Sequence, residues 1–295
     1  MPTMPKTRTI RVGAMQMICR DNKPEANVAK AMACCDKAAG RGVQILCFPE
    51  CASTGFDWIR RKNGPAKVYA EPVPGPMVDR FAAKARQTGM YIIMGVVELA
   101  GRTGRAKPVG KAQRGLYNTA FVVGPEEGYI GRQRKVLSEG AFLNGIEANV
   151  FETRLARIGI FICADMRSPE LARLLVLKGA QVLFQPTAYF HKDGKDIRRR
   201  YMGKCCCQRA RAIENGVHLI AANIGRQEFV NNSRIITPAH QGPEEVLARA
   251  TRREQLLVAD VRFDPEANGA LDVVKRSPHL FRELAKTISK AAKKL

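Results

Sequence analysis

Short apolar runs alternate with amphipathic segments along most of this chain, and this alternation limits its fold more than any other feature. Residues 43–50, VQILCFPE, are almost continuously apolar, which is typical of a strand buried on both faces of a sheet. Residues 91–98 and 181–188 have the same character, whereas residues 23–40 and 77–88 carry apolar side chains at helical spacing. Strands and helices that alternate in this way predict a layered α/β fold.

The rest of the chain continues this pattern without a linker or an internal repeat, so we predict a single domain over residues 1–295. Residues 117–124 and 129–135 flank the turn PEEG and predict an antiparallel hairpin. The basic, Gly-rich residues 101–115 predict an exposed hairpin loop, because they lack the spacing of a phosphate-binding loop. The last elements predicted are a helix at 199–215, short strands at 218–223, 233–238, 245–250 and 255–261, and a C-terminal helical tail at about 278–295.

The chain is strongly basic, with 49 Lys and Arg against 27 Asp and Glu and a formal net charge of +22. One interpretation is a solvated basic surface, and the other is attraction to nucleic acid. We favour the first, because the cations are spread over the whole chain and no nucleic-acid-binding module accompanies them.

The cysteines and histidines indicate neither a disulfide framework nor a metal site. Cys34 and Cys35 are contiguous, as are Cys205 to Cys207, which is a poor arrangement for separate bridges. The four histidines lack ligand spacing around any cysteine pair, so we expect no metal and no other cofactor. Free thiols and an N-terminus without an apolar segment predict a cytoplasmic protein that is not inserted in a membrane.

One stretch, residues 158–170 (IGIFICADMRSPE), predicts a buried strand, a tight turn and then a helix. Ser168 is the expected N-cap and Pro169 the first helical residue. Cys163 therefore lies at an elbow, near backbone N–H groups and the positive end of a helix dipole. Such a position favours the thiolate and can bind an oxyanion, so it suits a nucleophile.

Two further polar residues end predicted strands. Glu50 closes the buried strand at 43–50, and Lys135 closes the hairpin strand at 129–135. Taken singly, each of these residues has an ordinary explanation as a solvated side chain, and Cys163 as a small core residue. Together they form a set of a carboxylate, an ammonium and a thiol, each at a strand end.

These residues lie in segments that closely resemble motifs of the nitrilase superfamily of carbon–nitrogen hydrolases. FPECASTGF is similar to its Glu motif, GRQRK to its Lys motif, and ICADMRSPELARLLVLKGAQVL to its Cys motif. YNTAFVVGPEEGYIG, RARAIENGVHLIAANIG, SRIITP and LVADV resemble the remaining blocks in the same order, so the resemblance covers nearly the whole chain. It implies an α-β-β-α sandwich, in which two subunits pair into a four-layer α-β-β-α-α-β-β-α core, and hence a homodimer or a larger homo-oligomer.

The resemblance also implies catalytic roles. Cys163 would attack the carbonyl of an amide-like C–N bond, and water would later hydrolyse the thioester. Glu50 would be the general base, and Lys135 would stabilise the oxyanion together with a backbone N–H near Ala164. A free thiol needs such help, because only a few per cent of it is ionised at neutral pH.

Members of the superfamily also carry a second glutamate in a pattern like E-x-x-F-x-x-G, which residues 139–145 (EGAFLNG) fit. Glu139 is therefore the fourth catalytic candidate, and Glu147 is its competitor. Arg167 stands where carboxylate-binding members have an arginine, and a structural and a substrate-binding role are equally supported. Tyr117 and Asn118 are further candidates to line the pocket. Trp58 and Tyr189 are additional residues that could line it.

Departures from the family pattern limit the class of substrate that we expect. Ala164-Asp165 follows the cysteine where nitrilases proper have Trp-Glu, and CADMRSPE is most similar to the amidase branch that includes ω-amidase-like proteins. Val136-Leu137-Ser138 follows Lys135 without the usual histidine, and Ser168 stands where an aromatic residue is common. We therefore expect cleavage of a small linear amide or N-carbamoyl compound. The alternatives are nitrile hydrolysis, and a catalytically idle protein whose basic surface binds nucleic acid.

Overall fold

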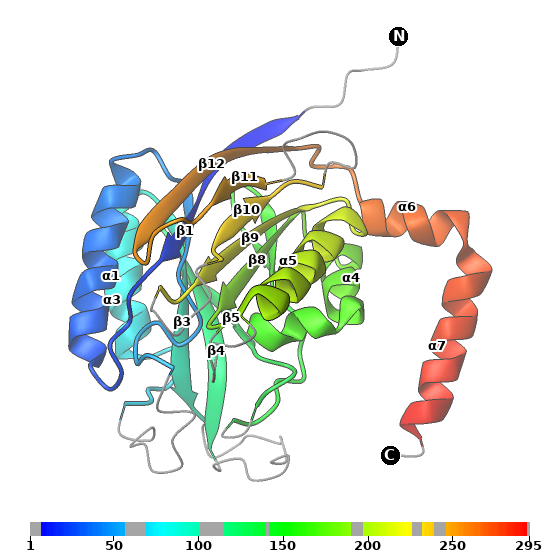
Figure 1. The fold of residues 1–295 in the computed structure, drawn as a ribbon, viewed down its shortest axis with the longest axis horizontal. Coiled ribbons are helices and arrows are strands. Elements are labelled where there is room, and N and C mark those ends of the chain that lie inside the picture. Colours follow the sequence, from blue (N-terminus) through cyan, green and yellow to red (C-terminus); the bar gives the residue numbers. More distant parts are fainter. Residues whose placement is uncertain are drawn as a thin grey trace.

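A computed structural model of the chain describes residues 7–56, 69–100, 115–139, 142–189, 197–225, 232–238 and 246–293. It contains two six-stranded sheets (Figure 1). The first sheet consists of β1 (Arg8–Gln16), β2 (Ile45–Cys47), β3 (Tyr91–Leu99), β4 (Leu116–Gly124), β5 (Gly128–Arg134) and β12 (Gln255–Phe263). The second consists of β6 (Val150–Glu152), β7 (Arg157–Ile160), β8 (Val182–Thr187), β9 (His218–Asn223), β10 (Arg234–Ile236) and β11 (Val246–Arg249). The helices are α1 (Pro24–Ala39), α3 (Pro76–Thr88), α4 (Pro169–Leu177), α5 (Ile197–Ile213), α6 (Gly269–Arg276) and α7 (Pro278–Ala292).

The sheets face one another between two helical layers. Helices α1 and α3 cover the outer face of the first sheet, and α4 and α5 cover the second (Figure 1). The predicted α-β-β-α sandwich is thus confirmed. Pairing of two such sandwiches across subunits stays a prediction.

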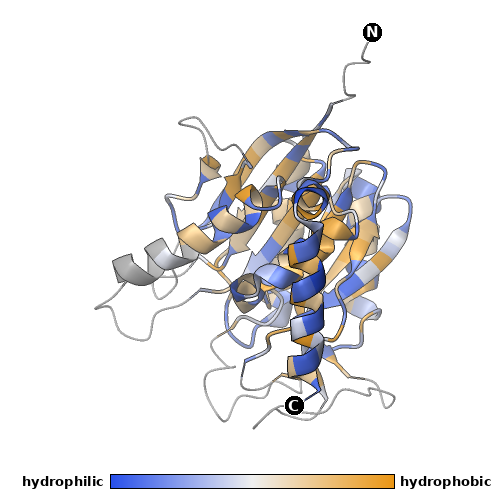
Figure 2. Cartoon of the chain, turned by 90° about the vertical axis from the view of Figure 1, so that its right-hand side faces the viewer, coloured by the Kyte–Doolittle hydropathy of each residue, from blue (hydrophilic) through white to orange (hydrophobic). Residues whose placement is uncertain are grey.

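Alternation along the strands separates two apolar cores. In β4, Ala120 and Val122 contribute to the core shared by the two sheets, whereas Phe121 points the other way and packs edge-to-face on Phe81 of α3 at 5.8 Å. Figure 2 shows the same distribution, with apolar residues concentrated in the sheets and hydrophilic ones on the outer surfaces.

Strand direction brings several strand ends to one edge. Strands β1, β2 and β3 are parallel, and two antiparallel pairings make β5 run in the direction of β3. The carboxyl ends of β2 and β5 therefore lie at the same edge of the first sheet. In the second sheet β7, β8 and β9 are parallel as well.

Of the two C-terminal helices, α6 packs against α4 through the buried Ala270, and α7 extends away from the sandwich. Helix α6, which the sequence did not predict, is capped by Asn268, whose side chain accepts a hydrogen bond from the Leu271 N–H. Helix α7 stands where a terminal helix was predicted, and it projects from the body with no buried residue (Figures 1 and 2). Within the part of the chain that the structure describes, no helix has the length and apolar character to cross a bilayer. Most of the predicted loop at 101–115, and Trp58, lie outside the described residues.

Candidate active site

The predicted elbow joins β7 to α4 through a short 3-10 helix, Cys163–Arg167. Cys163 has φ of 46°, a left-handed conformation that non-glycine residues rarely adopt. Ser168 is the N-cap of α4 and Pro169 follows it, as predicted, although the Ser168 hydroxyl bonds to Glu170 at 2.8 Å. Because α4 begins only at Pro169, the thiol lies at the start of a single 3-10 turn and not at an α-helix N-terminus.

Glu50 follows β2 and is completely buried. Its Oε1 accepts hydrogen bonds from Lys135 Nζ at 2.7 Å and from Asn118 Nδ2 at 2.6 Å. Its Oε2 is also buried and has no partner among the described residues. One carboxylate oxygen is therefore held in place while the other is free to accept a proton.

Lys135 follows β5 directly and exposes 1% of its side chain. Burial lowers its pKa, but the negative charges of Glu50, Cys163 and Glu139 outweigh burial, so the pKa is raised. The side chain is consequently a fixed ammonium, as an oxyanion partner must be.

The Cys163 thiol shares this enclosed environment. Burial, followed by the charge of Glu50, raises its pKa to about 12, although Lys135 acts in the opposite direction. Desolvation thus opposes the thiolate that the elbow was predicted to favour. The thiol needs a base, and Glu50 is the nearby carboxylate with a free oxygen.

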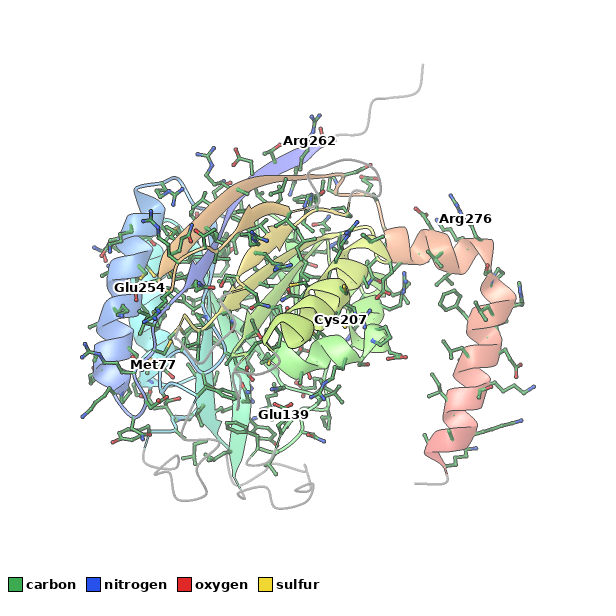
Figure 3. The ribbon with its side chains drawn as sticks, viewed as in Figure 1. Met77, Glu139, Cys207, Glu254, Arg262 and Arg276 are labelled. Carbon is green, nitrogen blue, oxygen red and sulfur yellow. The ribbon has the colours of Figure 1, made fainter. Side chains whose placement is uncertain are left out.

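Glu139 lies at the exposed side of this group, with 49% of its side chain accessible (Figure 3). Its Oε2 is 3.6 Å from Lys135 Nζ, and its Oε1 accepts a hydrogen bond from Arg167 Nη2 at 2.7 Å. The structure thus brings Glu139 and Arg167 to Lys135. The competitor Glu147 instead contacts Asn149 Nδ2 at 3.2 Å.

The other candidates occupy different positions. Asn118 contacts Glu50 and faces the space between the sheets, whereas the ring of Tyr117 lies on the opposite face of β4, 3.8 Å below the Arg134 guanidinium. The side chain of Tyr117 therefore points away from Glu50, and a role for it in lining the pocket stays a prediction. Ala164 is buried in the turn directly after Cys163.

A buried polar network, which was not predicted from the sequence, holds the backbone carbonyl of Cys163 in the elbow. The Cys163 carbonyl accepts hydrogen bonds from Gln185 Nε2 at 3.1 Å and from the Tyr189 hydroxyl at 3.4 Å. Gln208 Nε2 in turn donates to Gln185 Oε1 at 2.7 Å. A glutamine inside the apolar strand at 181–188 was the signal that could have revealed this network, because buried polar side chains require partners.

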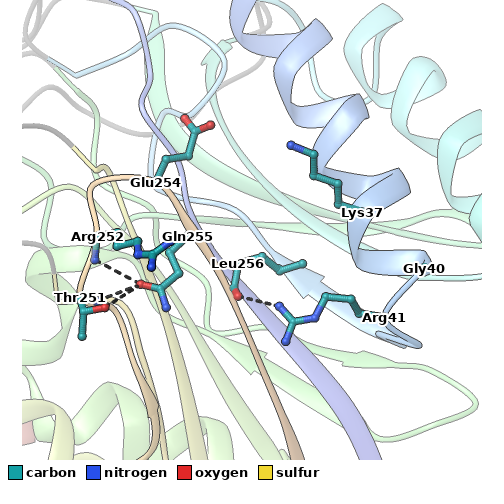
Figure 4. A pocket seen from close by; sticks show the side chains of 8 residues that line it. All are labelled: Lys37, Gly40, Arg41, Thr251, Arg252, Glu254, Gln255 and Leu256. Carbon is teal, nitrogen blue, oxygen red and sulfur yellow. Dashed lines mark hydrogen bonds between the residues drawn. The ribbon is translucent and has the colours of Figure 1, made fainter.

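A groove of about 790 Å³ lies elsewhere, between the end of α1 and the turn from β11 to β12 (Figure 4). Lys37, Arg41 and Arg252 line it, and no catalytic candidate does. Among the described residues, no group of three His, Cys, Asp or Glu side chains is arranged to hold a metal ion.

The sequence profile of the carbon-nitrogen hydrolase family matches residues 11–265. The chain belongs to the carbon-nitrogen hydrolase family. Omega-amidase NIT2 of Xenopus tropicalis is 30% identical to this carbon-nitrogen hydrolase over 272 residues, which cover 86% of this chain and 89% of the relative. A nitrilase of Pyrococcus abyssi is also 30% identical, over 256 residues that cover 83% and 87%.

Solved structures share the fold of this carbon-nitrogen hydrolase. A mutant of the amidase from Nesterenkonia AN1 superposes with a TM-score of 0.70 and 23% identity, covering 93% of this chain and 97% of that one. Nit3 of Saccharomyces cerevisiae gives a TM-score of 0.70 and 20% identity, covering 92% and 95%. The resemblance to the nitrilase superfamily is confirmed.

Proposed function

We propose that this carbon-nitrogen hydrolase cleaves a small linear amide or N-carbamoyl compound through a thioester on Cys163. The observation that carries the proposal is the buried contact of Lys135 Nζ with Glu50 Oε1 at 2.7 Å, in electrostatic contact with the Cys163 thiol. The names of relatives support the amide, since several are omega-amidases.

In the first half-reaction, Cys163 Sγ attacks the carbonyl carbon while Glu50 takes the thiol proton. The Lys135 ammonium and a backbone N–H near Ala164 stabilise the oxyanion that forms. Glu50 then passes its proton to the leaving nitrogen, the C–N bond breaks, and ammonia or an amine departs.

In the second half-reaction, Glu50 takes a proton from water as the water oxygen attacks the thioester carbonyl. The C–S bond breaks, the thiolate of Cys163 recovers the proton, and the carboxylic acid leaves. The unpartnered Oε2 of Glu50 suits this repeated proton transfer.

Three further residues have supporting roles in this proposal. Asn118 positions Glu50 through its hydrogen bond, and Glu139 assists at the exposed side of Lys135. The Arg167 guanidinium would release Glu139 and bind a substrate carboxylate, since 62% of the Arg167 side chain is accessible.

The test is a panel of linear ω-amides, N-carbamoyl compounds and the matching nitriles, with ammonia and acid measured for each. We expect an amide or carbamoyl compound to be the best substrate. Preference for the nitrile, with acid formed from it faster than from the amide, would establish nitrilase activity instead. No turnover, combined with tight and steeply salt-dependent nucleic-acid binding, would favour the binding-protein alternative.

The setting of the enzyme is also proposed. An active thiol at Cys163 requires a reducing compartment, for which the cytoplasm is our proposal. We further propose a homodimer in which the helical layers of two subunits pack together.

A further inference from the structure

A buried carboxylate next to the nucleophile has contacts that the proposed reaction does not use. Asp165 exposes 1% of its surface and lies within the 3-10 turn that follows β7. Its Oδ2 accepts a hydrogen bond from the Ile162 N–H at 2.9 Å, and its Oδ1 accepts from the Leu137 N–H at 2.7 Å and the Val136 N–H at 3.1 Å. Three backbone donors thus converge on one side chain.

These donors belong to two separate catalytic segments. Ile162 directly precedes Cys163 in the turn that follows β7 of the second sheet, whereas Val136 and Leu137 directly follow Lys135, which comes immediately after β5 of the first sheet. Asp165 therefore binds the backbone on both sides of the site and ties one sheet to the other.

We propose that Asp165 is a positioning residue that sets Lys135 against Cys163. The effect of this placement on turnover rests on the proposed function. The hydrogen bonds of Asp165 do not depend on that function. A shift of about 1 Å in a catalytic group can cost about 100-fold in rate, so a link of this kind matters for catalysis.

The carboxylate form is the one that fits these contacts. All three neighbours are N–H donors, and an ionised carboxylate offers only acceptors. Burial raises the pKa of Asp165 above its ordinary value, and the Leu137, Ile162 and Val136 N–H groups and the Lys135 charge offset only part of that rise. An asparagine would replace one carboxylate oxygen by an NH2 group. That NH2 group would then face a backbone N–H, so two donors would meet without an acceptor.

The experiment is a cycle of Asp165→Asn, Lys135→Met and the double variant, read by the rate at which iodoacetamide alkylates Cys163. Lys135 lowers the pKa of the Cys163 thiol, so Lys135→Met raises that pKa and leaves less thiolate to react. A thiolate of higher pKa is also more nucleophilic, so alkylation slows by only about threefold for each pKa unit. We expect Asp165→Asn to slow alkylation as well, and the double variant to be no slower than Lys135→Met alone. Independent, multiplicative effects, or no effect of Asp165→Asn, would overturn the proposal.

Turnover supplies the second readout. We expect Asp165→Asn to lower kcat by about 10- to 100-fold and to change KM much less, because placement and not substrate binding is lost. The control is Asp260→Asn, whose carboxylate is half exposed and pairs with Arg11 at 2.7 Å on β1, and which should leave kcat unchanged. A kcat for Asp165→Asn equal to that of the control contradicts the proposal.

The test stays decisive if Asp165→Asn fails to fold or if the proposed substrate class is wrong. If Asp165→Asn does not fold, Leu137→Pro replaces it in the cycle. Proline removes the N–H of the 2.7 Å bond and also fixes φ at this position and restricts Val136, so it disrupts the same contact from the Lys135 side, and Leu137 is 40% exposed. The double variant of Leu137→Pro with Lys135→Met is then expected to be alkylated no more slowly than Lys135→Met alone, and multiplicative effects again overturn the proposal. Because alkylation needs no substrate, the cycle can be read even if the proposed amide hydrolysis is wrong.

Discussion

Replacing Lys135 by methionine tests the physical basis of the site through stability as well as activity. The variant keeps an unbranched apolar side chain that is one atom shorter than lysine, and it removes the charge. Glu50 is then left as a buried carboxylate whose single remaining partner among the described residues is Asn118 Nδ2 at 2.6 Å. Removal of one member of a buried ion pair costs about 3–5 kcal/mol of unfolding free energy, because the other charge loses its compensation.

The double variant, Glu50→Gln with Lys135→Met, leaves neither charge of the pair in the pocket. We expect it to cost only about 1–3 kcal/mol relative to the native chain, which implies a coupling of at least about 3 kcal/mol between the two sites. Glu50→Gln, Lys135→Met and the double variant should all lose amide hydrolysis, so stability is partly recovered in the double variant while activity is not.

The assay is urea denaturation at one fixed protein concentration, with amide turnover measured in parallel. Arg11 and Asp260 offer a matched control, because their atoms are also 2.7 Å apart but 46% and 48% of their side chains are accessible. Arg11→Met should cost less than about 1 kcal/mol. Additive costs in the cycle, or a cost for Lys135→Met no larger than that of the control, would refute the reasoning.

Three further predictions address other parts of the molecule. Gly95→Ala should lower kcat by about tenfold or more, because the added Cβ would meet the Pro49 oxygen and come 2.9 Å from Glu50 Cα; native kinetics would contradict this. The rate of Cys163 alkylation by iodoacetamide should rise about tenfold per pH unit from pH 7 to 10, since its pKa of about 12 keeps the thiol protonated there; a plateau near pH 8.5 is the opposing result. Deletion of residues 278–295 should change the unfolding free energy by less than about 0.5 kcal/mol, because α7 buries no residue; a larger loss in urea denaturation would mean that a partner covers α7.

Local patterns were enough to predict most of the elements, because strands and helices here follow their own apolar periodicity. The run at 91–98 became β3, and the helical spacing at 77–88 became α3. Helix α6 was missed, since its eight residues are short and its cap at Asn268 is an isolated signal.

Position at strand ends was also enough to single out Glu50, Lys135 and Cys163 from the sequence. The convergence of the first two follows from strand direction, which the hairpin at 117–135 already indicated. That Cys163 faces them from a second sheet depends on how the sheets pack, and it entered the sequence interpretation only through the family resemblance.

Contacts between distant segments were beyond the sequence. Asp165 bonds to backbone groups 28 and 29 residues away, and no local pattern marks such a link. Tyr117 and Asn118 were both candidates, yet adjacent residues of a strand face opposite sides, so only Asn118 reaches Glu50. The burial that raises the pKa of the Cys163 thiol was beyond the sequence for a similar reason, because burial is a property of the folded chain.

The central claim, that Cys163 carries the acyl group, is tested most directly by the ammonia released by Cys163→Ala on the best amide of the panel. Cys206→Ala, which removes an exposed thiol of α5, serves as the control. We predict that Cys163→Ala folds with native circular dichroism and releases no ammonia above the uncatalysed rate, while the control keeps native turnover. Native ammonia release by folded Cys163→Ala would contradict the account.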